Sequence, residues 1–162
     1  MDANSLNDVA VVSVTGAARL GRVTQVLFET DPLRVAGLKA AAASGEFILP
    51  FDQVSRFGSD AVMVETPDVT QLSREGSAFS QLRTLTELKK LKVVDEAGTY
   101  VGTVQAVHFD PESGLVERLV AQSGGVLGVG RRGTDIEGTS VRSVGPDLLT
   151  IASSPEAAPS TD

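Results

Sequence analysis

The glycine-rich segment 128–133 comes closer than any other part of this sequence to a known chemical motif. It fits the pattern G-x-G-x-x-G, and its Arg131 and Arg132 could face a phosphate group. In dinucleotide-binding proteins this pattern opens a helix, whose N-terminus meets the pyrophosphate. Residues 134–138 read Thr-Asp-Ile-Glu-Gly and do not predict a helix. A nucleotide-binding enzyme is therefore the less favoured alternative, and we regard Arg131 and Arg132 as candidate contacts to a partner.

The other side chains that could do chemistry form no recognisable constellation. His108 is the single histidine, and no zinc-site or Ser-His-Asp motif surrounds it. Glu29 with Asp110 and Asp60 with Asp147 suggest acid-base pairs, but they fall at predicted turns, where carboxylates cap backbone N–H groups. We therefore expect no catalytic, cofactor-binding or metal-binding residue, and no enzyme.

The composition sets further bounds on function. The 162 residues allow one domain or two very small ones. The absence of cysteine removes disulfides and thiolate metal sites. A net charge of −7 argues against direct nucleic-acid binding and against affinity for anionic membrane surfaces. Since neither a signal peptide nor an apolar run of membrane-spanning length is visible, we expect a cytoplasmic protein without membrane insertion.

One stretch of sequence occurs twice, and it organises the chain. Residues 19–29 recur as residues 100–110 without a gap, so that Gly21 corresponds to Gly102 at an offset of 81 residues (102 − 21). Further downstream Gly58 corresponds to Gly145 at an offset of 87 (145 − 58). These four glycines mark two repeats. Gly21 and Gly102 are expected to let the chain bend or pack closely.

The elements around these markers are predicted to be mostly strands. The four alanines 40–43 favour a helix by propensity, but the equivalent segment 114–121 alternates like a strand, so we predict a strand for 33–43. A single helical turn is expected at 50–54, and another at 86–90 with Thr86 as N-cap. Other strands are predicted at 9–14, 19–29, 46–50, 61–65, 91–95 and 100–110.

The predicted organisation is thus two repeats, a linker and a tail. Residues 1–66 form repeat 1, residues 67–84 the linker and residues 85–152 repeat 2. Residues 153–162 are rich in Pro, Ala and Ser and are predicted to be a disordered tail. Whether the repeats pair within one chain or promote a homodimer stays open at this point.

Both repeats resemble the PRC-barrel family, named for the photosynthetic reaction-centre H subunit. The resemblance rests on 88–95 with 98–104 in repeat 2, and on 20–23, 35–38 and 48–62 in repeat 1. It implies an all-β fold of two tandem small antiparallel β-barrels with short helical turns. One departure is Glu137 in repeat 2, where the family usually has proline.

The resemblance also implies a role. Members of the family are binding platforms and are not known for catalysis, so we expect a non-catalytic adaptor or scaffold that binds a protein partner. Another family member, the ribosome maturation factor RimM, suggests an alternative role in ribosome maturation or RNA processing. The acidic balance and a second barrel in place of an RNA-linked N-terminal domain count against it.

Overall fold

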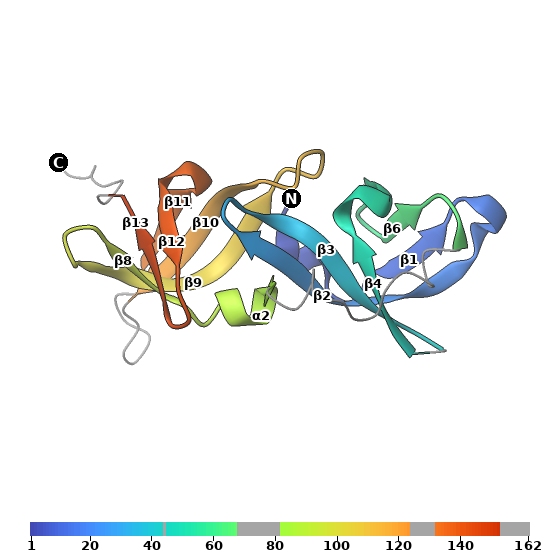
Figure 1. Ribbon diagram of the computed structural model, residues 1–162, viewed down its shortest axis with the longest axis horizontal. Coiled ribbons are helices and arrows are strands. Elements are labelled where there is room, and N and C mark those ends of the chain that lie inside the picture. The colour runs from blue at the N-terminus through green and yellow to red at the C-terminus, as the bar shows by residue number, and fades with distance from the viewer. Residues whose placement is uncertain (44, 68–81, 124–131, 153–162) are drawn as a thin grey trace.

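The computed structural model describes residues 1–43, 45–67, 82–123 and 132–152. They form two curved β-sheets, one for each repeat, which lie end to end with their longest strands meeting at the centre (Figure 1). The predicted disordered tail, most of the predicted linker and Arg131 lie outside the described residues.

Repeat 1 forms a sheet in the order β4-β3-β2-β1-β6-β5. Neighbouring strands run antiparallel, except that β1 and β6 run parallel. The elements are η1 (Ala3–Leu6), β1 (Ala10–Ser13), η2 (Thr15–Ala17), β2 (Arg19–Thr30), β3 (Leu33–Ala42), β4 (Gly45–Pro50), η3 (Phe51–Gln53), β5 (Val54–Phe57) and β6 (Ala61–Val64).

Repeat 2 repeats this topology strand for strand, in the order β11-β10-β9-β8-β13-β12 with β8 and β13 parallel. A short strand that precedes it, β7, pairs with β2 of repeat 1. The elements are β7 (Arg83–Thr84), α2 (Leu85–Leu88), β8 (Lys92–Asp95), β9 (Tyr100–Phe109), β10 (Val116–Ser123), β11 (Arg132–Glu137), η6 (Gly138–Ser140), β12 (Val141–Val144) and β13 (Leu148–Ile151).

Each sheet is rolled because its two edge strands are joined by a very short connection. The three residues of η3 link β4 to β5, and the three residues of η6 link β11 to β12. A connection this short brings the edges together and encloses the apolar face. The missing proline does not change the corner: Glu137 has φ −70° and ψ 143°, close to φ −61° and ψ 151° at Pro50.

The predicted strand at 33–43 and the helical turn at 50–54 are confirmed as β3 and η3. β3 pairs with a strand on each side, and this pairing overrides the helical propensity of alanine. The predicted N-cap of the second helical turn is wrong. Thr84 caps α2, because its hydroxyl accepts from the Glu87 N–H at 3.1 Å while the Glu87 carboxylate accepts from the Thr84 N–H at 2.9 Å.

The hydrophobic core is continuous across both repeats. Its largest fully buried side chains come from each sheet, from η1 and from α2: Leu6, Phe28, Phe47, Leu88, Phe109, Leu119, Ile136 and Leu149 among them. Few of these side chains are aromatic, as the composition predicts.

Candidate functional site

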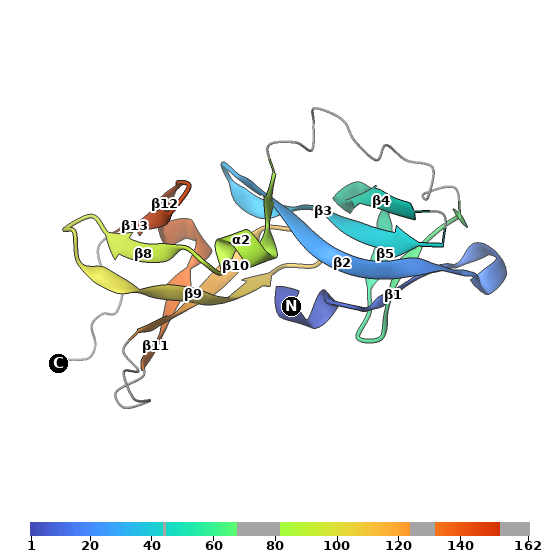
Figure 2. The same ribbon diagram turned by 90° about the horizontal axis from the view of Figure 1, so that it is seen from below.

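The helical turn that opens each repeat packs against the other repeat. η1 of repeat 1 contacts β9 of repeat 2, and α2 of repeat 2 contacts β2 of repeat 1 (Figure 2). The backbone follows the same exchange, since Asp2 bridges to His108 while Thr84 pairs with Leu27. The two pairs occupy equivalent positions in the two repeats. Thr84 lies 82 residues after Asp2 (84 − 2), and His108 lies 81 residues after Leu27 (108 − 27), which is the offset between the repeats to within one residue. The two repeats are therefore joined reciprocally.

The centre of this junction behaves like a two-fold axis. Arg34 and Leu115 bridge to each other, and they occupy equivalent positions at the 81-residue offset (115 − 34). A surface element that meets its own equivalent is the property of an isologous two-fold interface. Beside this bridge the Val35 N–H donates to the Gly114 carbonyl at 2.8 Å. The chain is thus folded as an internal pseudo-dimer.

An aromatic cluster breaks the symmetry of the junction. Phe51 stacks on Phe57 with ring centroids 5.6 Å apart, and Phe57 meets Phe109 of repeat 2 edge to face at 5.5 Å. Repeat 2 has Gly138 in the place of Phe51, where a Cβ would lie 1.8 Å from the Val116 carbonyl oxygen. The two repeats have therefore diverged at equivalent positions, although their backbones agree.

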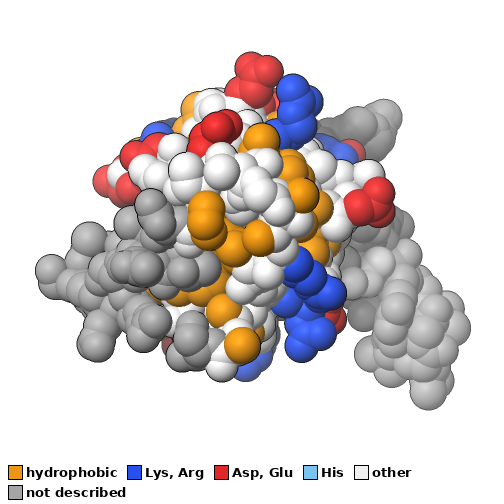
Figure 3. Space-filling view, turned by 90° about the vertical axis from the view of Figure 1, so that its right-hand side faces the viewer, with side chains coloured by type: hydrophobic (Ala, Val, Ile, Leu, Met, Phe, Trp, Pro, Cys, Tyr) orange, Lys and Arg blue, Asp and Glu red, His pale blue; other side chains and the backbone are white. Residues whose placement is uncertain are grey.

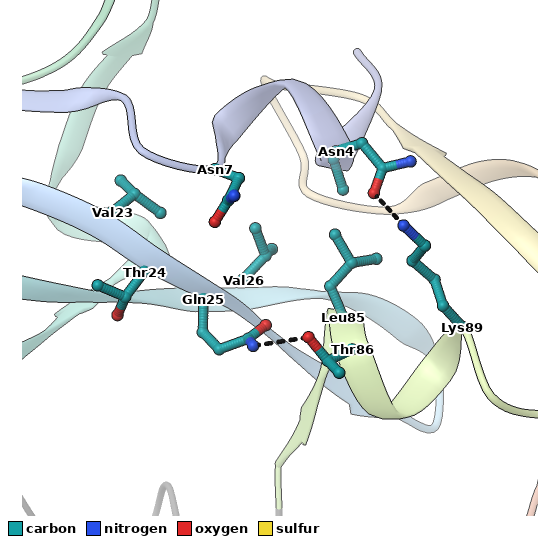
Figure 4. Close-up of a pocket in the computed structure, with 10 residues that line it drawn as sticks. Asn4, Asn7, Val23, Thr24, Gln25, Val26, Leu85, Thr86 and Lys89 are labelled. Atoms are coloured by element: carbon teal, nitrogen blue, oxygen red, sulfur yellow. Dashed lines mark hydrogen bonds between the residues drawn. The ribbon is translucent and has the colours of Figure 1, made fainter.

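A pocket of about 320 Å³ lies between η1, α2 and β2 (Figure 4). Four of its polar side chains form two pairs: the Lys89 ammonium donates to Asn4 Oδ1 at 2.9 Å, and Gln25 Nε2 donates to Thr86 Oγ1 at 2.8 Å. Both bonds connect repeat 1 with repeat 2, so the polar groups of this pocket act as a joint between the repeats. The full lining is Ala3, Asn4, Asn7, Val23, Thr24, Gln25, Val26, Leu85, Thr86 and Lys89.

The acidic residues considered for catalysis lie at or next to turns. Asp110 Oδ1 accepts from the Glu112 N–H at 2.9 Å in the β9–β10 turn, and Glu29 forms an ion pair with Arg34. His108 is half-buried on β9 and forms a backbone bridge to Asp2. Within the described ranges no group of three metal-ligating side chains comes together.

The structure describes only the end of the glycine-rich segment 128–133. Its last two residues belong to β11, which begins at Arg132 and pairs with β10. A strand therefore follows the glycines, whereas a pyrophosphate motif of this pattern requires a helix. This arrangement counts against a nucleotide site there.

The four repeat glycines occupy two pairs of equivalent positions, and the first pair lies at close approaches between strands. A Cβ on Gly21 would lie 2.4 Å from the Ala41 carbonyl oxygen, and one on Gly102 would lie 2.9 Å from that of Gln122. Gly58 and Gly145 occupy the turns before β6 and β13. Their N–H groups donate to the carbonyls of Ala61 at 2.9 Å and Leu148 at 2.8 Å.

The outward side of the β1–β6 sheet carries apolar side chains with arginines beside them. Across one row Arg19, Val12, Met63 and Arg56 are successive cross-strand neighbours on β2, β1, β6 and β5. The next row along the strands contains Arg22, Ala10 and Ala61. Alternation along β1 continues to Val14, whose side chain is 53% exposed. We call these eight residues the repeat 1 outer face.

The equivalent surface of repeat 2 has a different chemistry. One row contains Tyr100, Val94, Thr150 and Ser143, and the next contains Thr103, Lys92 and Leu148. Tyr100 and Leu148 are 51% and 45% exposed. We call these seven residues the repeat 2 outer face. Sequence reasoning missed both outer faces, because their members are spread over four strands.

The protein combines two rolled sheets of identical topology with exposed outer faces and a reciprocal junction. The family model of the PRC-barrel domain matches residues 1–71 and again residues 81–157. The chain therefore belongs to the PRC-barrel domain family, and it contains the domain twice. Comparison with curated protein sequences finds no significant match to the chain. None of its described helices is long and apolar enough to cross a membrane.

Proposed function

We propose that this protein is a non-catalytic adaptor that binds a protein partner through the outer faces of its two barrels. One observation carries the proposal. Of the four large hydrophobic side chains that stand out as exposed in the described chain, three lie on the outer faces: Val14, Tyr100 and Leu148. The fourth, Leu115, lies at the pseudo-two-fold centre.

Exposed apolar side chains that gather on one surface mark interaction sites more often than scattered ones do. The outer faces also have the form that an adaptor requires. They lie on hydrogen-bonded strands of the two sheets, and the continuous core joins one repeat to the other. A partner with two binding sites would meet both faces at once, and the second contact would then be favoured by proximity. The side chains at equivalent positions differ between the two outer faces, so the two faces would bind two different sites on a partner.

A pull-down from native lysate tests this function. The wild-type chain is compared with Val14→Ser/Tyr100→Ser/Leu148→Ser, and with Arg131→Glu/Arg132→Glu as a second surface change. We expect the outer-face variant to lose a partner that the wild-type chain retains. A partner lost only through Arg131 and Arg132 would move the binding site to the β10–β11 connection. Turnover of a nucleotide or ester in an activity screen would refute the non-catalytic role.

A further inference from the structure

The repeat 1 outer face is basic, although the protein as a whole is acidic. Three arginines lie on it, while the net charge of the chain is −7. Arg22 is 3.6 Å from the carboxylate of Asp8, and both side chains are more than half exposed. Arg19 and Arg56 are exposed, and neither forms an ion pair with another residue that the structure describes.

The apolar part of this face lies between the two arginines without an ion pair. Val12 and Met63 are neighbours on β1 and β6, with Arg19 on one side and Arg56 on the other. Val14 continues the apolar surface along the strand direction. Hydrophobic side chains also gather at the end of the molecule formed by repeat 1, with Lys and Arg side chains beside them (Figure 3).

From this arrangement we infer that the repeat 1 outer face docks an acidic protein segment that carries an apolar side chain between its carboxylates. The inference rests on the proposed adaptor function and specifies its partner. Guanidinium groups bind carboxylates through charge-assisted hydrogen bonds, and Val12 and Met63 receive the apolar side chain. The equivalent positions of Arg19 and Arg56 in repeat 2 are Tyr100 and Ser143, so this chemistry belongs to repeat 1.

The strand geometry also sets the spacing of the partner's residues. The backbones of Arg19 and Arg56 are separated by three strand spacings, which is about 14 Å. An extended segment covers this distance in about four residues. Because alternate side chains of an extended segment face the same side, the matching pattern is acidic, any, apolar, any, acidic. Carboxylates at the margin of the face, Asp8 and Glu65, disfavour a uniformly acidic surface such as a bilayer of anionic lipid.

The probe that tests this inference is a fluorescein-labelled peptide with the core Glu-Ser-Val-Ser-Glu, titrated with the full-length protein by fluorescence anisotropy. Two control peptides replace both Glu by Gln, or Val by Ser. Three protein variants accompany the wild type. Arg19→Gln/Arg56→Gln removes the arginines, Lys39→Gln/Lys90→Gln removes two exposed charges that lie on neither outer face, and Tyr100→Ser/Leu148→Ser changes the repeat 2 outer face.

We expect the wild type to bind the probe, and the arginine variant to bind it about tenfold more weakly, as the loss of two exposed ion pairs implies. The lysine variant, which loses the same charge, keeps the wild-type affinity. Both control peptides bind more weakly than the probe, and added salt weakens the wild-type complex. Thermal melts of all variants verify that they are folded.

Three results would overturn the inference outright, and a fourth would move the binding site to repeat 2. The first three are an undetectable wild-type complex, equal losses in the arginine and lysine variants, and equal or tighter arginine-dependent binding of duplex DNA or anionic vesicles. If only Tyr100→Ser/Leu148→Ser weakens the complex, the binding site lies on repeat 2, and the adaptor function survives while this assignment fails. The pull-down described above tests the adaptor function independently of the peptide.

Discussion

Gly21→Ala offers a sharp test of how closely the first two long strands of repeat 1 approach each other. A Cβ at this position would lie 2.4 Å from the Ala41 carbonyl oxygen and 3.3 Å from the Phe47 ring. The carbonyl cannot move freely, because β3 is paired on both sides. The strands must therefore separate locally.

The magnitude follows from two opposing effects. Overpacking costs roughly 1–3 kcal/mol, and the contact here is at the severe end. Replacing glycine also reduces the entropy of the unfolded chain, which returns about 0.4–1 kcal/mol. We expect a net destabilisation of about 2 kcal/mol, which lowers Tm by about 4–8 °C for a chain of this length.

Gly133→Ala is the matched control, since Gly133 also lies in a strand. Among the described residues, its Cβ would meet only Val120 Cγ1, at 3.9 Å, which is an ordinary contact. This variant should be neutral or more stable than the wild type by about 0.5 kcal/mol. Urea unfolding monitored by circular dichroism measures both variants, with unchanged m-values. Equal stabilities for Gly21→Ala and Gly133→Ala would show that the close approach does not constrain the sheet.

Three further predictions concern the β8–β9 turn, the cap of α2 and the junction. Asp95→Ala should lower the free energy of unfolding by about 1–2 kcal/mol, because the buried carboxylate accepts hydrogen bonds from two backbone N–H groups at 2.9 Å. Chemical denaturation measures this loss of stability. An unchanged stability would mean that water replaces the carboxylate. Thr84→Ala should lower the free energy of unfolding by about 1 kcal/mol, because it removes an N-cap, and it should destabilise the protein clearly more than Thr86→Ala does. A larger fall in Tm for Thr86→Ala would contradict the assignment of Thr84 as the cap. A protease site placed between residues 67 and 82 should, once cut, leave both halves in one size-exclusion peak, because the core crosses the junction; two separate peaks would refute a tight pseudo-dimer.

Local sequence signals were enough to predict most of the elements. The Ala run at 40–43 was predicted correctly as a strand because the second copy at 114–121 alternates more clearly. The helical turn at 50–54 followed from local signals as well. The N-cap of α2 was predicted wrongly, although Thr84 and Glu87 stand in the capping-box spacing that identifies such a cap. The capping-box spacing is thus a local signal that identifies Thr84 rather than Thr86 as the N-cap.

The candidate surfaces could not be predicted in the same way. Arg19, Val12, Met63 and Arg56 become neighbours only when four strands pair in a particular register. That register depends on a bulge between Val11 and Val12, where both residues are valine. Periodicity alone therefore cannot say which of the two valines faces the core. Arg131 was a natural candidate from sequence because its neighbours in the chain form a motif.

What the sequence alone determined is the duplication, the strand-rich character and the family, because these depend on residue types at short and regular spacing. Tertiary structure decided how the copies meet. The exchange of η1 and α2 between repeats and the bridge of Arg34 with Leu115 join residues far apart in the chain: 61 positions separate Gln25 from Thr86, and 81 (115 − 34) separate Arg34 from Leu115. Such contacts form because each rolled sheet leaves apolar surface that the opening turn of the other repeat covers, and no local pattern records which surface remains exposed.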